Sequence, residues 1–409
     1  MKIFKLTAGL LFMIFSGQIS AQNIENSVSL KPFTESLNRN KVTQILFLGD
    51  SHIQADHLTA YLRKKLQDKY GNAGRGLIFP SQIANTNGAE DIVSATSTTW
   101  ETYRLVHGQN RFSQLGASGF VIGNNENSFI EIQLKNPEDR FDRVIIFNDQ
   151  KMNGQNFEVY SETDLLKNFV QKKSEKINYT AAEGETFHEI VAKNYSTTTK
   201  LRQMNGDRIL QPKAGNSFSV ERNSFVYNSD FENTVQKLFD AKFTGFKTEI
   251  NYAQPQQIFL MKTHAADGNL FYGFQFLKNA EKGVVLNAVG VNGATYADFL
   301  KFPLQTEQLK KIPADLLVIA LGTNEAFGKT NKEELQNNIS TLIQKLRAGN
   351  SDLPVLLIAP PDNLPKNARV VEVISWIKES AAQNNAAFFN LYEATGGKGY
   401  FKRAQQRKE

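Results

Sequence analysis

The stretch ILFLGDSHIQADHL, residues 45–58, decides the fold of this chain. It opens with an apolar run that predicts a buried strand, and Gly49, Asp50 and Ser51 stand at the end of that strand. Apolar residues at helical spacing then predict a helix over residues 57–71. In a parallel α/β sheet, ligands bind outside the carboxyl ends of the strands, where the next helices begin. The pattern therefore places the Ser51 hydroxyl in such a crevice, unless Asp50 and Ser51 serve only as helix caps.

Strands and helices alternate again in the last third of the chain. Continuous apolar runs predict strands, and amphipathic spacing predicts helices; the strands are residues 283–291, 314–322, 354–360 and 386–392, and the helices are residues 331–349 and 368–384. This alternation indicates a parallel sheet with both faces covered. Short alternating runs between Gly, Asn and Pro turns instead indicate an antiparallel β-rich insertion. We expect one α/β domain in two parts, residues 41–75 and 281–409, interrupted by the insertion at residues 76–280.

The N-terminus predicts export. Lys2 and Lys5 precede a short apolar run, and small residues follow it, which is the pattern of a signal peptide over residues 1–21. The run is too short to span a bilayer as a mature helix, and no later segment approaches that length, so no membrane span is expected. Residues 22–40 are polar and predict a linker. We expect a protein of the periplasm or cell envelope.

Composition excludes several kinds of site. The chain has no Cys, which excludes disulfides, Cys-ligated zinc, a Cys nucleophile and a lipid anchor on Cys. The five His are few and dispersed, so no metal site is predicted. The net charge of +6 is scattered, which is typical of a solvated surface. In an exported protein this excess of positive charge favours an anionic envelope polymer over nucleic acid as a partner.

Two further turns follow predicted strands and carry groups that suit an oxyanion. In NAVGVNGATYADF, Gly293 lets a main-chain N–H approach a ligand closely, although a turn requirement alone would also explain it. In VIALGTNEAFG, the side-chain amide of Asn324 at a strand end can donate to an oxyanion.

Taken together, the blocks GDS, NGAT and GTNE resemble those of the SGNH, or GDSL-type, hydrolases, in the same order and at strand ends. The resemblance implies a flavodoxin-like parallel sheet and no cofactor. It implies that Ser51 is the nucleophile. It also implies an oxyanion hole built from the main-chain N–H groups of Ser51 and Gly293 and the amide of Asn324.

This sequence departs from the family's pattern in two details, and three further residues are expected to support the site. The glycine block is one residue longer than expected, which leaves Gly290 as an alternative second donor. Glu325 stands where the family more often has Asp. Three residues beside the nucleophile are expected to support the site: Gly49, Asp50 and His52.

A general base is not evident. The family carries it in a last block, Asp-x-x-His, and the printed sequence contains no such block. The five histidines all precede the strand at residues 386–392; they are His52, His57, His107, His188 and His264. His52 adjoins Ser51, but neighbouring side chains diverge, and a serine hydroxyl without a base is a weak nucleophile. We therefore expect a truncated or frameshifted reading frame of a working enzyme, with a genuine pseudoenzyme as the alternative.

A small unit lies within the insertion. Residues 179–220 predict the order strand, helix, short helix, strand, and the marks Tyr179, EGETF and Asn205 make residues 178–221 resemble a LysM module, which binds N-acetylglucosamine polymers. The resemblance implies a sugar groove made by two loops; its residues are Gly184, Glu185, Thr186, Phe187, Asn205, Gly206, Asp207 and Ile209. The block GNAGRGLIFP after the first helix resembles the β-sandwich of peptidoglycan O-acetylesterases.

These patterns lead to three functional hypotheses. The first is an exported serine ester hydrolase that acts on O-acetyl groups of peptidoglycan or another glycan containing N-acetylglucosamine. The second is a peptidoglycan-binding protein without catalysis. The third is an acyl transferase on the same fold.

Overall fold

A central parallel sheet organises the molecule. The computed structural model describes residues 24–106, 114–162, 170–264, 268–363 and 367–407, so the predicted signal peptide lies outside the described residues. The five strands run in the order β15-β1-β16-β17-β18, and their bounds are β1 Val42–Gly49, β15 Gly283–Gly290, β16 Leu316–Ala320, β17 Val355–Ile358 and β18 Ala387–Phe389. In chain order this is the flavodoxin-like arrangement 2-1-3-4-5, and the prediction of a parallel α/β sheet is confirmed.

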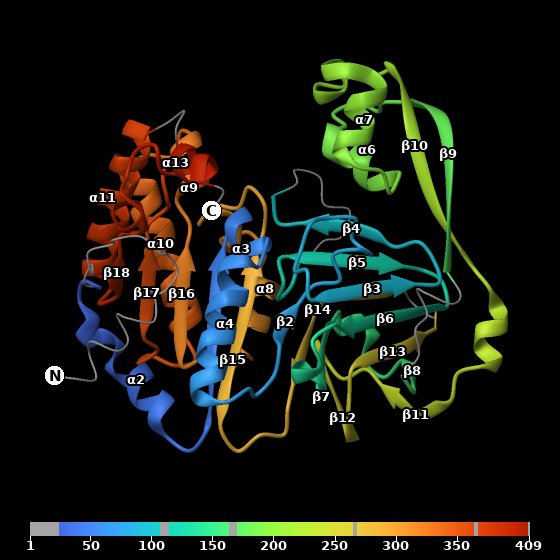
Figure 1. Cartoon of the computed structure of the whole chain (residues 1–409), viewed down its shortest axis with the longest axis horizontal. Helices are drawn as coiled ribbons and strands as arrows, with labels where there is room; N and C mark the ends of the chain where they lie inside the picture. The colour runs from blue at the N-terminus through green and yellow to red at the C-terminus, as the bar shows by residue number, and fades with distance from the viewer. Residues whose placement is uncertain (1–23, 107–113, 163–169, 265–267, 364–366, 408–409) are drawn as a thin grey trace.

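Helices cover both faces of this sheet (Figure 1). Successive residues of a strand point to opposite faces, so Phe47 packs with one layer of helices and Leu48 with the other. The first layer contains α2 Lys31–Asn38 and α4 His57–Tyr70; the second contains α8 Pro303–Leu309, α10 Lys332–Arg347 and α11 Asn367–Gln383. Because every strand is buried on both faces, its sequence is a continuous apolar run.

The structure corrects the prediction of a linker over residues 22–40. A 3-10 turn, η1 Ser27–Leu30, leads into α2, and Leu30, Phe33 and Leu37 are buried against the sheet. The polar residues around them conceal this helical spacing in the sequence. The segment is therefore part of the α/β core.

The insertion forms two antiparallel sheets that pack face to face, as Figure 1 shows. The first has the order β11-β8-β13-β6-β3, with bounds β3 Ile92–Thr96, β6 Ser128–Leu134, β8 Asn156–Tyr160, β11 Lys237–Lys242 and β13 Ile258–Thr263. The second has the order β12-β7-β14-β5-β4, with bounds β4 Glu101–Arg104, β5 Phe120–Asn124, β7 Phe141–Asn148, β12 Lys247–Gln256 and β14 Asn269–Leu277. Their shared core is rich in aromatic side chains such as Phe157, Phe259 and Phe274.

A short strand joins this sandwich to the parallel sheet. The strand β2 Gly76–Ile78 pairs with β14, and its Leu77 N–H donates to Asn287 Oδ1 on β15 over 3.0 Å. Gly76 has φ +85°, and a Cβ atom there would lie 2.3 Å from the Leu286 carbonyl oxygen, so only glycine fits. This junction fixes the sandwich against β15, next to β1 and its Ser51 turn.

The small unit extends from the sandwich on two long strands. Its β9 Val170–Thr180 and β10 Ser217–Tyr227 pair antiparallel and enclose α6 Phe187–Lys193, α7 Thr198–Asn205 and the turn η4 Gly206–Leu210. The order of elements is the one predicted, but the strands extend beyond residues 178–221. Figure 1 shows the two helices beside β4. Tyr195 anchors the unit there, because its hydroxyl donates to the Trp100 carbonyl over 2.6 Å.

The described residues include no helix that is both long enough and apolar enough to cross a bilayer. Five further 3-10 turns connect the strands and helices; they are η2 Pro137–Asp139, η3 Gln150–Met152, η5 Ser229–Asn233, η6 Asp298–Leu300 and the η4 turn named above.

Candidate active site

Three loops leave the parallel sheet at adjacent strand ends. Gly49 is in register with Gly290 on β15 and with Ala320 on β16. Two residues after Gly49, Ser51 begins the short helix α3 Ser51–Gln54, and its side chain is exposed. The glycine and asparagine blocks follow Gly290 and Ala320 directly. The three blocks of the sequence therefore leave the sheet at one edge, beside its switch point.

A glycine brings α3 against the end of β15. A Cβ atom on Gly290 would lie 2.0 Å from the Gln54 nitrogen and 2.4 Å from the Ile53 carbonyl carbon. Gly290 thus serves the packing of α3. Gly293 lies on the loop beyond it with φ +84°, a conformation that favours glycine.

Asp50 organises the turn that carries Ser51. Its buried carboxylate accepts from the His52 N–H over 3.0 Å and lies 2.8 Å from His52 Nδ1. The hydrogen bond with Asp50 raises the pKa of His52, although partial burial opposes it. The His52 ring stacks on Phe401 with centroids 6.3 Å apart. Asp50 and Phe401 therefore fix the position of the His52 ring.

No histidine whose side chain the structure describes forms a hydrogen-bonded nucleophile–base pair with Ser51. The structure describes the side chains of His52, His57 and His264, and none of these three is hydrogen-bonded to Ser51. His57 begins α4, and His264 lies 3.6 Å from Glu158 in the sandwich. His107 and the side chain of His188 lie outside the described residues.

The asparagine block is clamped to the glycine block. Asn324 lies on α9 Thr323–Phe327, and its Nδ2 donates to the Ala294 carbonyl over 2.9 Å. An amide nitrogen carries two hydrogens, so one remains for a ligand. The next residue, Glu325, accepts from the Tyr296 N–H over 2.7 Å. These two bonds fix the Asn324 amide relative to the loop that carries Gly293.

The environment of Glu325 was not predicted from the sequence, where this residue was noted only as a replacement for the family's usual Asp. Burial raises its pKa to about 7, and the nearby Asp50 carboxylate adds to the shift. Its Oε1 is bonded to Tyr296, whereas its Oε2 is buried with no hydrogen-bond partner among the described residues. A protonated or weakly ionised carboxyl group is the form that this environment favours.

A largely apolar cavity of about 550 Å³ opens beside Ser51. Tyr61 and Leu62 of α4 and Phe389 of β18 form part of its wall. Two helices at the C-terminal side close it, α12 Leu391–Ala394 and α13 Tyr400–Arg407, which contributes Phe401. An ester bound at Ser51 would meet apolar side chains on this side.

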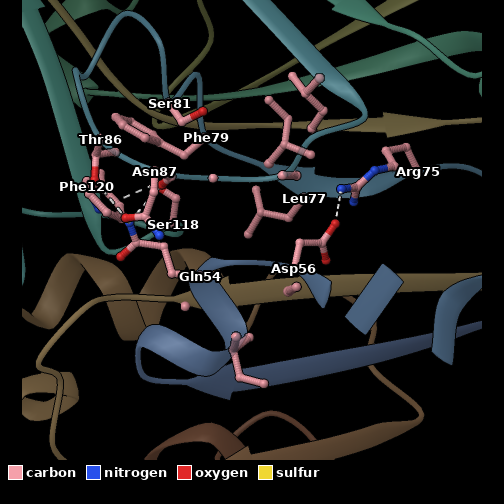
Figure 2. A pocket seen from close by; sticks show the side chains of 17 residues that line it. Gln54, Asp56, Arg75, Leu77, Phe79, Ser81, Thr86, Asn87, Ser118 and Phe120 are labelled. Carbon is pink, nitrogen blue, oxygen red and sulfur yellow. Dashed lines mark hydrogen bonds and ion pairs between the residues drawn. The ribbon is translucent and has the colours of Figure 1, made fainter. Parts of the chain in front are cut away.

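A second, smaller cavity lies beside α3 and has polar side chains at both ends (Figure 2). It measures about 60 Å³. Figure 2 shows Gln54 directed toward Thr86 and Asn87 at one end, and Arg75 toward Asp56 at the other. Sequence reasoning missed this group because its members come from segments far apart in the chain.

The eight residues predicted to bind sugar divide into three sets. Gly184, Thr186, Gly206 and Asp207 are exposed on the small unit. Phe187 and Ile209 are buried in its core.

The remaining two predicted sugar ligands are also occupied within the unit. Glu185 is buried and accepts from Tyr179 Oη over 2.7 Å and from Lys193 Nζ over 2.5 Å. Asn205 Nδ2 donates to the Ser219 carbonyl over 2.8 Å. In the folded unit both side chains are engaged in internal hydrogen bonds, and the role of these residues in glycan binding stays a prediction.

Comparison with known proteins now identifies part of the chain. Residues 264–406 match the GDSL-like lipase/acylhydrolase family. The match includes the glycine and asparagine blocks and stops short of the Ser51 turn. No curated protein is similar in sequence.

One solved structure extends the likeness to most of the chain. A peptidoglycan O-acetylesterase superposes with a TM-score of 0.61 at 17% identity, over 93% of this chain and 87% of that one. At this identity the likeness shows a shared fold alone. A lipase/acylhydrolase from Enterococcus faecalis (TM-score 0.23, 25% identity, 28% of this chain, 59% of that chain) also matches. So does the acetylxylan esterase Axe2 from Geobacillus stearothermophilus (TM-score 0.24, 14% identity, 30% of this chain, 59% of that chain).

Proposed function

We propose that this protein is a serine ester hydrolase that removes O-acetyl groups from cell-wall glycan. The observation that supports this most directly is the register of the sheet, which ends three neighbouring strands at Ser51, at the glycine block and at Asn324. The GDSL-like match and the peptidoglycan O-acetylesterase neighbour agree with the same chemistry.

Each residue has a role in the reaction. Ser51 Oγ attacks the acetyl carbonyl carbon, and the oxyanion accepts from the N–H groups of Ser51 and Gly293 and from Asn324 Nδ2. The bond from Asn324 to Ala294 holds the amide in place before the substrate arrives, so that little reorganisation is needed. The bond between the acetyl carbon and the sugar oxygen breaks, and the proton that Ser51 loses ends on the sugar oxygen, which leaves as a hydroxyl group. Water then hydrolyses the acetyl-Ser51 ester, which releases acetic acid and restores the Ser51 hydroxyl.

The substrate proposal rests on the small unit and on export. A signal peptide at residues 1–21 would deliver the protein to the cell envelope. The unit would bind a glycan containing N-acetylglucosamine through the exposed Gly184, Thr186, Gly206 and Asp207. A polymer held there raises the effective concentration of its acetyl groups near Ser51.

One observation favours a second candidate, a glycan-binding protein without catalysis. The proton of Ser51 needs a base, and the histidines whose side chains are described make no bond to Ser51. His52, the nearest in sequence, is engaged by Asp50. Such a protein would keep the fold and the small unit and would lack turnover.

Acetate release from O-acetylated peptidoglycan separates the two candidates. We expect the wild-type protein to release acetate, and both the Ser51→Ala protein and chemically de-O-acetylated polymer to give none above background. Polymer binding without acetate release by the wild type would support the second candidate. Equal release by wild type and Ser51→Ala would overturn the assignment of Ser51.

A further inference from the structure

The last side chain of α3 connects three parts of the chain. Gln54 is buried, and its Oε1 accepts from the Asn292 N–H over 2.6 Å. Its Nε2 donates to Asn87 Oδ1 over 2.9 Å and to the Asn87 carbonyl over 2.8 Å. The nucleophile helix is thus bonded both to the glycine block and to a loop of the insertion.

A third bond closes these contacts into a ring. Asn292 Nδ2 donates to Asn87 Oδ1 over 2.8 Å, so that this one oxygen accepts from both other amides. Figure 2 shows Gln54 directed toward Asn87 at one end of the small cavity. We call Gln54, Asn87 and Asn292 the amide ring. Its three members come from α3, from the segment 85–87 and from the loop that carries Gly293.

The segment 85–87 is also held from the opposite side. Asn85 adopts the left-handed conformation, with φ +49°. Its Nδ2 donates to the Val191 and Ser196 carbonyls of the small unit, each over 3.1 Å. The segment therefore lies between the small unit and the catalytic edge of the sheet, and both ends are hydrogen-bonded.

We propose that Asn87 is a positioning residue, whose Oδ1 sets the place of the Gly293 N–H relative to Ser51 through Gln54 and Asn292. The physical argument is that the Val291 N–H makes the last bond to β1, to the Gly49 carbonyl over 3.2 Å, so residues 292 and 293 lie past the end of the ladder with β1. An oxyanion donor must be held to within about half an ångström, which requires support from a second layer of side chains. The amide ring supplies that support, and its catalytic meaning rests on the proposed esterase function.

The choice of variants follows from the bonds. Asn87→Ala removes the shared acceptor, whereas Asn87→Asp keeps an oxygen that can accept from both amides. Asn72 provides a matched control at the far end of β15, where Asn72 pairs with Val284. Its Nδ2 donates to Asp139 Oδ1 and to the Glu138 carbonyl, each over 2.9 Å, so Asn72→Ala also breaks bonds between the two parts of the molecule.

Amide hydrogen exchange of the full chain tests the proposal without requiring turnover. We expect Asn87→Ala to speed exchange in the peptide covering residues 288–296 by about tenfold, the usual scale for loss of a buried hydrogen-bond partner. Asn87→Asp should stay near wild type, and Asn72→Ala should leave this peptide unchanged. Equal exchange of residues 288–296 in the Asn87→Ala and Asn72→Ala proteins would overturn the proposal, as would an Asn87→Asp protein that exchanges as fast as Asn87→Ala.

Ester hydrolysis gives the second readout. With p-nitrophenyl acetate, Asn87→Ala should lower kcat about tenfold with little change in KM, because the oxyanion donor matters more in the transition state than in the bound ester. Asn87→Asp should restore kcat. A wild-type protein without turnover would count against the proposed function alone, since the exchange experiment still decides the role of Asn87.

Discussion

Asn324 shows how one side chain can be both anchored and available. One of its amide hydrogens is bonded to the Ala294 carbonyl, which leaves the second to donate to a substrate oxygen. In the proposed reaction that donor acts mainly on the tetrahedral intermediate.

Removing this donor should therefore slow the chemical step. We expect Asn324→Ala to lower kcat by roughly 10²–10³, with KM changed only slightly, as measured with p-nitrophenyl acetate. The control is Asn331→Ala, which removes an Asn that caps α10 by accepting from the Glu334 N–H and should reduce stability without changing kcat. A kcat for Asn324→Ala equal to that of Asn331→Ala would exclude the amide from the oxyanion hole.

Glu325 should make stability depend on pH. Its pKa is raised by burial from 4.5 to about 7, so the folded state binds its proton more tightly than the unfolded state. The free energy of unfolding should then fall as pH rises from about 4.5 to about 7, by up to about 3 kcal/mol, and should level off above that range.

Denaturant unfolding of wild type and Glu325→Gln at both ends of that range checks this. The glutamine is neutral at every pH, so the variant should lack this part of the decline and gain on wild type as the pH rises. If the two proteins lose the same stability across the range, Glu325 does not titrate as the buried carboxyl group described above.

At the scale of elements, close packing of α3 on β15 holds the turn at Asp50 and Ser51 in place. This packing depends on Gly290, because any Cβ there would overlap the backbone at Gln54. We expect Gly290→Ala to destabilise the protein by about 1–3 kcal/mol and to lower esterase activity as α3 shifts.

Thermal unfolding of Gly290→Ala against Gly349→Ala measures that effect. Gly349 has nothing within 4 Å of an added Cβ, so alanine there should be close to neutral. Similar melting temperatures for the two variants would mean that α3 moves freely on β15.

The sequence was most informative where burial and hydrogen bonding are local. The parallel strands were predictable because both of their faces are buried, and the helices α4, α10 and α11 because their apolar stripes are regular. Helix α2 was missed because three apolar side chains hold it within a polar stretch.

The site divides in the same way. The strand-end blocks with Ser51, Gly293 and Asn324 can be read from the sequence. The bond from Gln54 to Asn292 joins residues 238 positions apart, and no spacing rule reports such a contact. The burial of Glu185 could not be predicted either, because its bonds with Tyr179 and Lys193 form only in the folded unit.

At the scale of the whole molecule, buried charges join the insertion to the α/β domain that contains the parallel sheet. Arg75, just before β2, is fully buried and donates to Asp56 Oδ2 and to Asp91 Oδ2, each over 2.5 Å. Burial alone would lower the pKa of Arg75, but the Asp56 and Asp91 carboxylates raise it, so the guanidinium remains charged. These bonds fix the start of the insertion, which carries Arg75 and Asp91, against Asp56 at the start of α4.

If the small unit binds the glycan, a protein that lacks this unit should still fold but should no longer bind peptidoglycan. Val170 pairs with Tyr227 at the base of β9 and β10, so residues 171–226 can be replaced by an Asn-Gly turn. We expect this variant to unfold in a cooperative thermal transition and to lose most of its sedimentation with insoluble peptidoglycan, whereas Ser51→Ala should bind like wild type. Full binding by the shortened protein would place the glycan contact elsewhere.

The central claim is that Ser51 is a nucleophile activated by its position at the edge of the sheet. A fluorophosphonate, which reacts covalently with activated serine hydroxyls, tests this directly when the adduct is located by peptide mass spectrometry. The account predicts one adduct on the peptide that contains Ser51 and no labelling of the Ser51→Ala protein. A folded wild-type protein that stays unlabelled at Ser51, or that is labelled equally after Ser51→Ala, would contradict it.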